Sequence, residues 1–299
     1  MSQTEHDRLT RFLLPHAGVR GVHVHLGDTW VQIRERSDYP PAVSELLGEA
    51  SAAAALFTGH AKIEGRLSIQ LRGEGALRTL FAECTAAGTL RAIARTSEQD
   101  DAVVSRDLRE LGPGALLAIT IENPASGDRE PTRYQGLVPI ESDSLVGAFE
   151  GYFEQSEQLP TRLLLAAAGD EVAGVMLQKL PGDSGDDDGW NRASILFDTL
   201  DTQELLALPA TTLLNRLFSE EEVQRLGEKP LSFACSCSRE RVSAMLQSLG
   251  SDEAHAALAD GEATIRCEFC GQSYRFDRAG IDALFTSPGL QSPMPDRVQ

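Results

Sequence analysis

Four cysteines near one end of the chain are the residues whose type and spacing could do chemistry. In the stretch FACSCSRERV a single residue separates Cys235 from Cys237, and in RCEFCGQSYRF two residues separate Cys267 from Cys270. Zinc binds four thiolates in a tetrahedron with Zn–S distances of about 2.3 Å, and each closely spaced pair supplies one edge of it. Gly271 follows the last cysteine and gives the backbone the freedom that a turn around a thiolate requires.

Spacing alone leaves three interpretations of these cysteines open: a metal cage, two unrelated reduced pairs, or a permanent disulfide knot. C-x-C is less common than C-x-x-C at structural zinc sites, so the pattern is a variant. The sequence shows neither a secretory leader nor an apolar run of membrane-spanning length, which predicts a cytoplasmic protein with no membrane partner. A reducing compartment disfavours constitutive disulfides. We therefore favour one zinc ion per chain, held by Cys235, Cys237, Cys267 and Cys270.

The cysteines lie in a small module that we place at residues 231–287. So few residues bury little apolar surface, whereas structural zinc contributes on the order of 10 kcal/mol to folding such a unit. The metal therefore decides whether the module folds, and oxidation of the thiolates would eject the metal and unfold the module. The expected core residues are Phe233, Val242, Met245, Leu246, Leu249, Ile265, Phe269, Tyr274 and Phe276.

Two further sets of residues near or outside this pattern need an interpretation. Arg239, Arg241 and Arg266 either offset the negative charge of a zinc tetrathiolate or lie on an ordinary solvated helix face. The fifth cysteine, Cys84, lies far from the other four in the sequence, and we expect it to be a small buried apolar residue.

The long cysteine-poor part of the chain predicts an α+β domain over residues 1–180, because strand-like and helix-like segments are intermixed without a regular strand–helix repeat. We expect a hairpin at 21–33, helices at 41–61 and from Ser142 to Gln155, and strands within 65–84, 115–123, 133–140, 161–169 and 171–181. His23 and His25 share one face of the expected hairpin, where surface residues are favoured over metal ligands.

The composition changes after this domain. PGDSGDDDG is typical of a flexible acidic segment, and leucines at helical spacing follow from Leu205 to Phe218. Such short helices are not stable alone in water, so we expect their apolar face to cover apolar surface on the N-terminal domain. We therefore assign residues 181–230 to a metastable helical linker and the proline-rich residues 288–299 to a disordered tail.

The charge of the chain argues against nucleic acid as a partner. A net charge of −18 repels phosphate backbones, and no dense Lys/Arg run lies beside the cysteines. RGEGALR is not a phosphate loop, because Arg78 stands where G-x-G-x-x-G needs its third glycine, so nothing supports ATP use. Two rival functions stay open: a zinc-ribbon module that binds nucleic acid or protein, and a thiol-disulfide oxidoreductase, although the C-x-x-C lacks a βαβ setting.

The chain resembles the 33 kDa chaperonin family, the redox-regulated heat-shock holdases of bacteria. The stretches that carry the resemblance are FACSCSRER, CEFCGQSYRFD, SDYPPAVSELLGEASAAAAL, KIEGRLSIQLRGEGALRTL, YFEQSEQLPTRLLL and TQELLALPATTLLNRLFSEEEV. Together they extend over nearly the whole chain, from Arg20 to Phe285. The resemblance implies a chaperone and not an enzyme.

What the resemblance further implies is a redox switch. Reduced protein would hold zinc on the four cysteines and be inactive. Peroxide with mild heat, or hypochlorous acid, would drive formation of the disulfides Cys235–Cys237 and Cys267–Cys270 and release the zinc. The zinc module and the linker would then unfold, and the activated protein, as a homodimer, would hold unfolding or oxidatively damaged client proteins without ATP.

Overall fold

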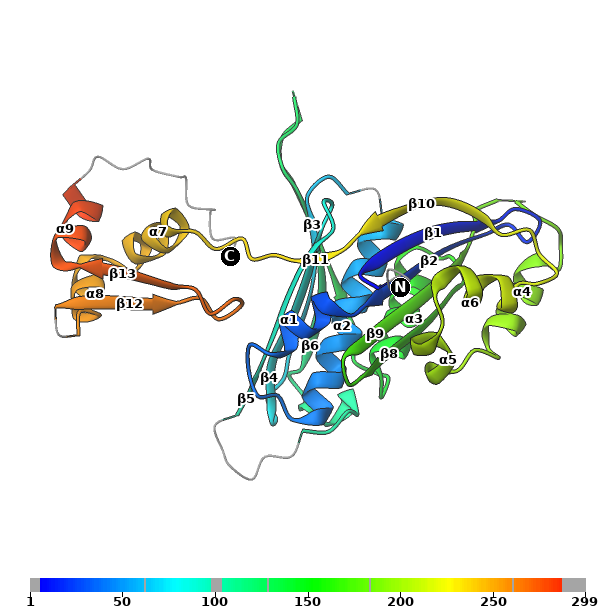
Figure 1. Cartoon of the computed structure of the whole chain (residues 1–299), viewed down its shortest axis with the longest axis horizontal. Coiled ribbons are helices and arrows are strands. Elements are labelled where there is room, and N and C mark those ends of the chain that lie inside the picture. The colour runs from blue at the N-terminus through cyan, green and yellow to red at the C-terminus, as the bar shows by residue number, and fades with distance from the viewer. Residues whose placement is uncertain are drawn as a thin grey trace, which may run out of the picture. The chain divides into compact units, whose positions relative to one another are not determined.

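The structure is a computed structural model that describes residues 6–61, 63–97, 104–127, 129–182, 184–259 and 261–286. The chain divides into two compact units, Met1–Ala234 (unit 1) and Cys235–Gln299 (unit 2), whose elements are labelled in Figure 1. The fold is α+β, as expected. The predicted tail, 288–299, lies outside the described residues.

Unit 1 contains a five-stranded antiparallel sheet, sheet A, with the strand order β10-β1-β2-β9-β8. Its strands are β1 (Arg8–Leu14), β2 (Val19–Leu26), β8 (Thr161–Ala168), β9 (Glu171–Lys179) and β10 (Gln224–Pro230). Every residue of the central strand β2 is buried except Arg20, which is half-buried. Both faces of sheet A are therefore covered at its centre.

A second sheet of unit 1, sheet B, has six strands in the order β11-β5-β4-β3-β6-β7. Only β11 and β5 run parallel to each other. The strands are β3 (Arg66–Arg72), β4 (Leu77–Thr85), β5 (Thr89–Thr96), β6 (Leu116–Asn123), β7 (Thr132–Val138) and β11 (Ser232–Phe233). Strand β11 brings the chain across the edge of this sheet directly before unit 2 begins.

Helix α2 (Pro41–His60) packs against strands of both sheets and joins them in one hydrophobic core. Pro41 suits the first turn, where no intrahelical partner for its nitrogen is needed. Alanines at 50 and 52–55 are fully buried, and their small side chains let both sheets approach the helix closely. The other elements of this core are α1 (Asp28–Arg34), the 3₁₀ helix η1 (Leu108–Leu111) and α3 (Leu145–Ser156).

Most of the elements expected in unit 1 are confirmed, but the hairpin at 21–33 is wrong. Strand β2 ends at Leu26 and helix α1 follows, with Trp30 and Ile33 buried one helical turn apart. His23 and His25 are accordingly buried residues of a central strand and not surface residues. Helix α3 begins at Leu145, later than the expected Ser142, and is capped by Ser144, whose hydroxyl accepts a 3.3 Å hydrogen bond from Gly147 N.

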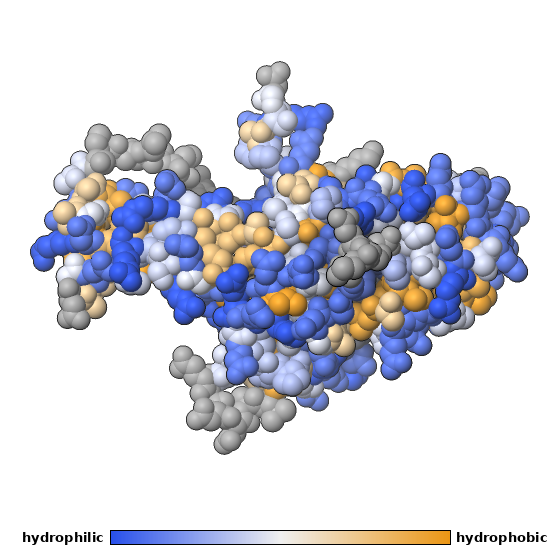
Figure 2. Space-filling model, in the orientation of Figure 1, coloured by the Kyte–Doolittle hydropathy of each residue, from blue (hydrophilic) through white to orange (hydrophobic). Residues whose placement is uncertain are grey.

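The linker region contains three short helices that pack on sheet A: α4 (Gly189–Phe197), α5 (Thr202–Ala207) and α6 (Ala210–Leu217). Their apolar side chains and those of the sheet form a cluster that we call the docking core: Phe12, Leu14, Ala17, Val19, Ala166, Ala173, Val175, Leu177, Ala193, Phe197, Leu200, Leu205, Leu213, Leu214 and Phe218. The surface over α5 and α6 mixes hydrophobic with hydrophilic residues (Figure 2). The expectation that the segment from Leu205 to Phe218 covers apolar surface of the N-terminal domain is confirmed.

The end of the linker region is a strand and not a helix. Residues 224–230 form β10, which pairs with β1 at the edge of sheet A and is mostly exposed. Glycine and proline make this stretch a poor helix, and pairing with β1 satisfies its backbone. Among the described residues, no helix combines the length and the apolar character that crossing a bilayer demands.

Unit 2 is small and has a small core. Strands β12 (Glu262–Arg266) and β13 (Ser273–Asp277) form an antiparallel hairpin beside helices α7 (Arg239–Leu249), α8 (Ser251–Ala256) and α9 (Arg278–Thr286). Its buried core residues are Leu246, Ala254, Ala263, Phe276 and Ile281. The expectation is correct for Leu246 and Phe276 and wrong for Met245 and Leu249, which are exposed, while Phe233 packs against the core of unit 1.

Candidate metal centre

Two backbone segments of unit 2 present the four cysteines. Cys235 and Cys237 lie in the extended segment before α7, whose N-terminus is capped by Ser238. Cys267 and Cys270 lie in the turn that joins β12 to β13. That turn is closed by backbone hydrogen bonds of 2.8 Å from Cys267 N to Gln272 O and from Gly271 N to Cys267 O. Gly271 has φ 73°, a conformation that favours glycine, as its place in the sequence predicted.

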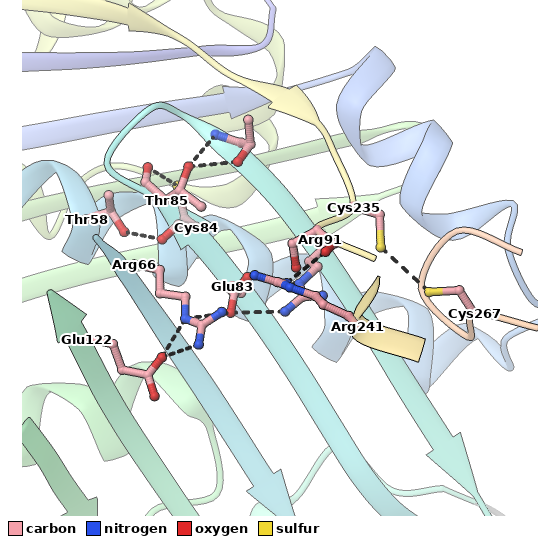
Figure 3. A network of polar contacts seen from close by, with 12 residues as sticks. Thr58, Arg66, Glu83, Cys84, Thr85, Arg91, Glu122, Cys235, Arg241 and Cys267 are labelled. Atoms are coloured by element: carbon pink, nitrogen blue, oxygen red, sulfur yellow. Dashed lines mark hydrogen bonds and ion pairs between the residues drawn. The ribbon is translucent and has the colours of Figure 1, made fainter. Parts of the chain in front are cut away.

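The four sulfur atoms lie close together. The Sγ atoms of Cys235 and Cys267 are 3.7 Å apart, a pair that Figure 3 shows, and those of Cys237 and Cys270 are 3.3 Å apart. All four lie within 4.8 Å of one another. A tetrahedron with metal–sulfur bonds of about 2.3 Å has sulfur–sulfur edges of roughly 3.8 Å. The structure therefore brings together all four cysteines that the sequence singled out, at separations that could hold a metal ion.

Tyr274 is a residue of this site that the sequence indicated only as core. Its hydroxyl donates a 3.1 Å hydrogen bond to Cys237 Sγ. Burial opposes ionisation of Cys237, but the hydrogen bonds from Tyr274 and Cys270 outweigh burial and lower the pKa of Cys237 to about 7. Burial raises the pKa of Cys235, and it raises that of Cys270 to about 12. One thiolate thus forms readily near neutral pH, and a bound cation must favour the others.

The arginines beside the cysteines make other contacts. Arg239 donates to the Arg275 carbonyl at 2.9 Å and lies over the Phe276 ring, and Arg241 donates to the Ser236 carbonyl at 2.8 Å. Both guanidinium groups thereby hold the backbone around the cysteines in place. The contacts of both guanidinium groups are with carbonyl oxygens and a ring.

Replacing Tyr274 with phenylalanine should weaken metal binding by roughly ten-fold, because groups that hydrogen-bond a metal ligand commonly contribute 10- to 100-fold to affinity. The ring would keep its packing while the hydroxyl contact to Cys237 is lost. Competition with a chromophoric chelator measures the affinity. Tyr134→Phe is the matched control, since it removes a hydroxyl in unit 1 that contacts Tyr152. Equal affinities for Tyr274→Phe and the unaltered protein would contradict a role for the hydroxyl.

Cys84 is fully buried on β4, as expected, and burial raises its pKa to about 12. Its carbonyl accepts a 3.3 Å hydrogen bond from the Thr58 hydroxyl, and Figure 3 shows it beside a row of ion pairs that crosses sheet B. In that row Arg91 contacts Glu83 at 2.9 Å, and Arg66 lies between Glu83 and Glu122. Burial outweighs Thr58 and Lys229, which favour the thiolate, so these surroundings disfavour a reactive thiolate at Cys84.

Comparisons with known proteins agree with one another. The Hsp33 protein family model matches residues 7–277. The 33 kDa chaperonin of Ectopseudomonas mendocina is 42% identical over 97% of this chain and 99% of its own length. That of Hahella chejuensis is 43% identical over 95% of this chain and 99% of its own length. The crystal structure of the 33 kDa chaperonin of Thermotoga maritima superposes with a TM-score of 0.73 at 19% identity, covering 93% of this chain and 98% of its own length.

The chain combines a two-sheet α+β domain with a small unit that contains four clustered cysteines. Together with the family match and these relatives, this combination identifies a heat-shock chaperone. The chain belongs to the 33 kDa chaperonin (Hsp33) family. This is a family of chaperones and not of enzymes, so the oxidoreductase alternative is wrong. A chaperone binds client proteins. The role of the four-cysteine centre in that activity is the subject of the proposal below.

Proposed function

We propose that the protein is a redox-regulated holdase that works without ATP, and that its four cysteines hold one zinc ion while reduced. The observation that carries this proposal is the group of four thiols within 4.8 Å in unit 2. Four thiols at this separation suit zinc, which favours tetrahedral sulfur coordination. Peroxide with heat, or hypochlorous acid, oxidises the thiolates to Cys235–Cys237 and Cys267–Cys270 disulfides, and the zinc leaves.

Loss of the metal removes most of what keeps unit 2 folded. In the described part of unit 2 five core residues are buried, two of them alanines, whereas structural zinc contributes on the order of 10 kcal/mol. Without zinc the unit therefore melts. The linker before it is the next element to lose support, because α4–α6 are short helices held by packing on sheet A and β10 is held at the edge of that sheet by pairing with β1.

Undocking the linker exposes the surface that clients bind. In the docked state, the exposed large hydrophobic residues among those described are Leu116, Tyr134, Leu137, Ile195, Leu226, Met245 and Leu249, and none of them belongs to the docking core. The docking core, by contrast, is a continuous apolar cluster with aromatic residues on both sides, Phe12 on the sheet and Phe197 and Phe218 on the linker. Contiguous apolar surface of this kind binds unfolded chains. The activated form is a cytoplasmic homodimer, with neither nucleic acid nor membrane as a partner.

The metal and the disulfide pairing have direct tests. Freshly reduced protein should contain one equivalent of zinc, measured by atomic spectroscopy, and should release it on treatment with peroxide at elevated temperature. Peptide mapping should then find Cys235 linked to Cys237 and Cys267 to Cys270. Much less than one equivalent of zinc would contradict the metal assignment. Links between Cys235 and Cys267, whose sulfurs are also adjacent, would contradict the pairing.

A further inference from the structure

A second group of metal-ligating side chains lies in unit 1, at one end of sheet A. His6 Nδ1 and His25 Nε2 each lie 2.9 Å from the same oxygen of Glu171, Oε2. The three ligand atoms lie within 4.8 Å of one another, and the two imidazole rings are 4.5 Å apart between centroids. None of these residues belongs to the four-cysteine centre, and the chaperone function proposed above does not use them.

Three separate segments bring these side chains to one place. His6 precedes β1, His25 lies near the end of β2, and Glu171 opens β9 after the turn from β8. The antiparallel register pairs His25 with Arg8 on one side and with Ala173 on the other. All three side chains therefore lie at the same end of sheet A. Residues far apart in the sequence thus form a compact group whose composition is two imidazoles and one carboxylate.

The backbone before β1 is fixed so that His6 faces the other two. Asp7 adopts φ 57°, and its carboxylate accepts hydrogen bonds from Gly27 N at 3.2 Å and Thr29 N at 3.0 Å. The Asp7 carbonyl accepts a 2.8 Å hydrogen bond from Leu231 N, just after β10. Gly27 lets the His6 side chain approach closely. A Cβ at position 27 would lie 3.2 Å from His6 Cβ, which is tighter than an ordinary van der Waals contact. The His6 position is thus held by several independent contacts.

We propose that His6, His25 and Glu171 form a second binding site for a divalent transition-metal ion of the zinc, cobalt or nickel type. Imidazole and carboxylate ligands suit these ions. Metal–ligand bonds of about 2.0–2.1 Å place neighbouring ligand atoms of a tetrahedron roughly 3.3 Å apart, so the observed contacts need to open only slightly. Three protein ligands leave the remaining coordination positions to water.

The surroundings of the three ligands leave the site open to a cation. The rings of His23 and His25 lie on the same strand with their centroids 6.4 Å apart. His25 is almost fully buried, whereas His6 and Glu171 are partly exposed and leave the site accessible from solvent. His23 Nε2, two residues away on the same strand, is buried with no hydrogen-bond partner in the described part of the chain. The Glu171 carboxylate offsets one of the two positive charges of the ion.

The site differs from the four-cysteine centre in its response to oxidants. Imidazole and carboxylate ligands are not converted to disulfides, so metal binding here does not depend on the redox state of the thiols. A bound ion would link the segment before β1 to the start of β9, next to the backbone contact between Asp7 and Leu231. It would thereby stabilise the end of sheet A at which the chain continues from β10 to Leu231.

Titration of untagged, full-length, zinc-loaded and reduced protein with Co²⁺ tests this proposal. The protein should bind about one further equivalent, with visible cobalt bands but without the thiolate charge-transfer bands that exchange into the cysteine centre would give. His6→Gln and Glu171→Gln should each weaken this binding at least ten-fold. Glu171→Gln keeps an oxygen for both histidines, and His6 is partly exposed, so the two variants should fold.

His16→Gln is the matched control, because exposed His16 pairs with Glu222 at 3.5 Å but has no second histidine in its contacts among the described residues. It should bind cobalt as the unaltered protein does. The proposal is overturned if no further equivalent binds, if His6→Gln binds as tightly as His16→Gln, or if all bound cobalt shows thiolate bands. Circular dichroism and zinc content of each variant verify that sheet A and the cysteine centre are intact.

Discussion

Cys267→Ser protein should contain almost no zinc, and its unit 2 should be unfolded at 25 °C while unit 1 stays folded. Removing one of four thiolates forfeits most of a stabilisation that is on the order of 10 kcal/mol. The hydrophobic core of unit 2 cannot replace it, because its buried members among the described residues are only Leu246, Ala254, Ala263, Phe276 and Ile281. Unit 1 has its own large core around α2 and should keep its stability.

Hydrogen exchange resolved by peptide, together with zinc content, measures this result. Amide protection in β12, β13 and α7 should disappear, whereas protection in α2 and β2 should persist. Cys84→Ala is the matched control, since Cys84 is buried in unit 1 and is not one of the four clustered cysteines. It should keep one zinc and full protection in unit 2. A protected, folded unit 2 in metal-free Cys267→Ser protein would contradict the metal's structural role.

Leu213→Asp should make the reduced, zinc-loaded protein active as a chaperone without oxidation. Leu213 is buried in the docking core between α6 and sheet A. An uncompensated buried charge costs about 3–5 kcal/mol, and the short helices α4–α6 have little stability of their own to offset that cost. The linker should therefore undock although zinc stays bound.

Suppression of aggregation of a thermally unfolding client measures the activity. Reduced Leu213→Asp should approach the level of the oxidised, unaltered protein, and its zinc content should remain one equivalent. Thr212→Asp introduces the same charge at the exposed neighbouring position on α6 and should leave the reduced protein inactive. If Leu213→Asp protein were as inactive as Thr212→Asp when reduced, undocking of the linker would not be what exposes the client-binding surface.

The sequence predicted the cysteine centre well because local spacing determines it. Two closely spaced pairs and Gly271 are signals that lie within a few residues of one another, and the structure brings the four sulfurs together as those signals indicated. Helix α2 was predictable for a similar reason, since Pro41 and a stretch rich in alanine and leucine mark it. The apolar spacing from Leu205 to Phe218 likewise indicated a face that must pack.

The features that the sequence could not predict depend on tertiary packing, that is, on which helices and strands lie against each other. Trp30 and Ile33 appeared to continue a strand, because nothing local shows that the chain turns into α1 after Gly27. His23 and His25 appeared to be surface residues because alternation in a hairpin predicts one exposed face, whereas sheet A is covered on both faces. Strand β10 escaped notice because its pairing with β1 joins residues from opposite ends of unit 1.

The contact between Tyr274 and Cys237 and the group of His6, His25 and Glu171 are also long-range. Tyr274 reaches the sulfur because the hairpin of β12 and β13 carries it beside the cysteine turn. His6 reaches Glu171 only through the register of three strands in sheet A. Neither has a spacing signal in the sequence, since Tyr274 lies 37 residues from Cys237, and Glu171 lies 165 residues from His6 and 146 from His25.

The central claim is that the same four sulfurs hold zinc and control chaperone activity. Its most direct test follows zinc release, with a chromophoric indicator, and suppression of client aggregation in one sample during treatment with peroxide at elevated temperature. The account predicts that both rise together, that the reduced protein protects the client little, and that reduction with added zinc reverses both. Equal protection of the client by reduced, zinc-loaded protein and by oxidised, zinc-free protein would contradict it.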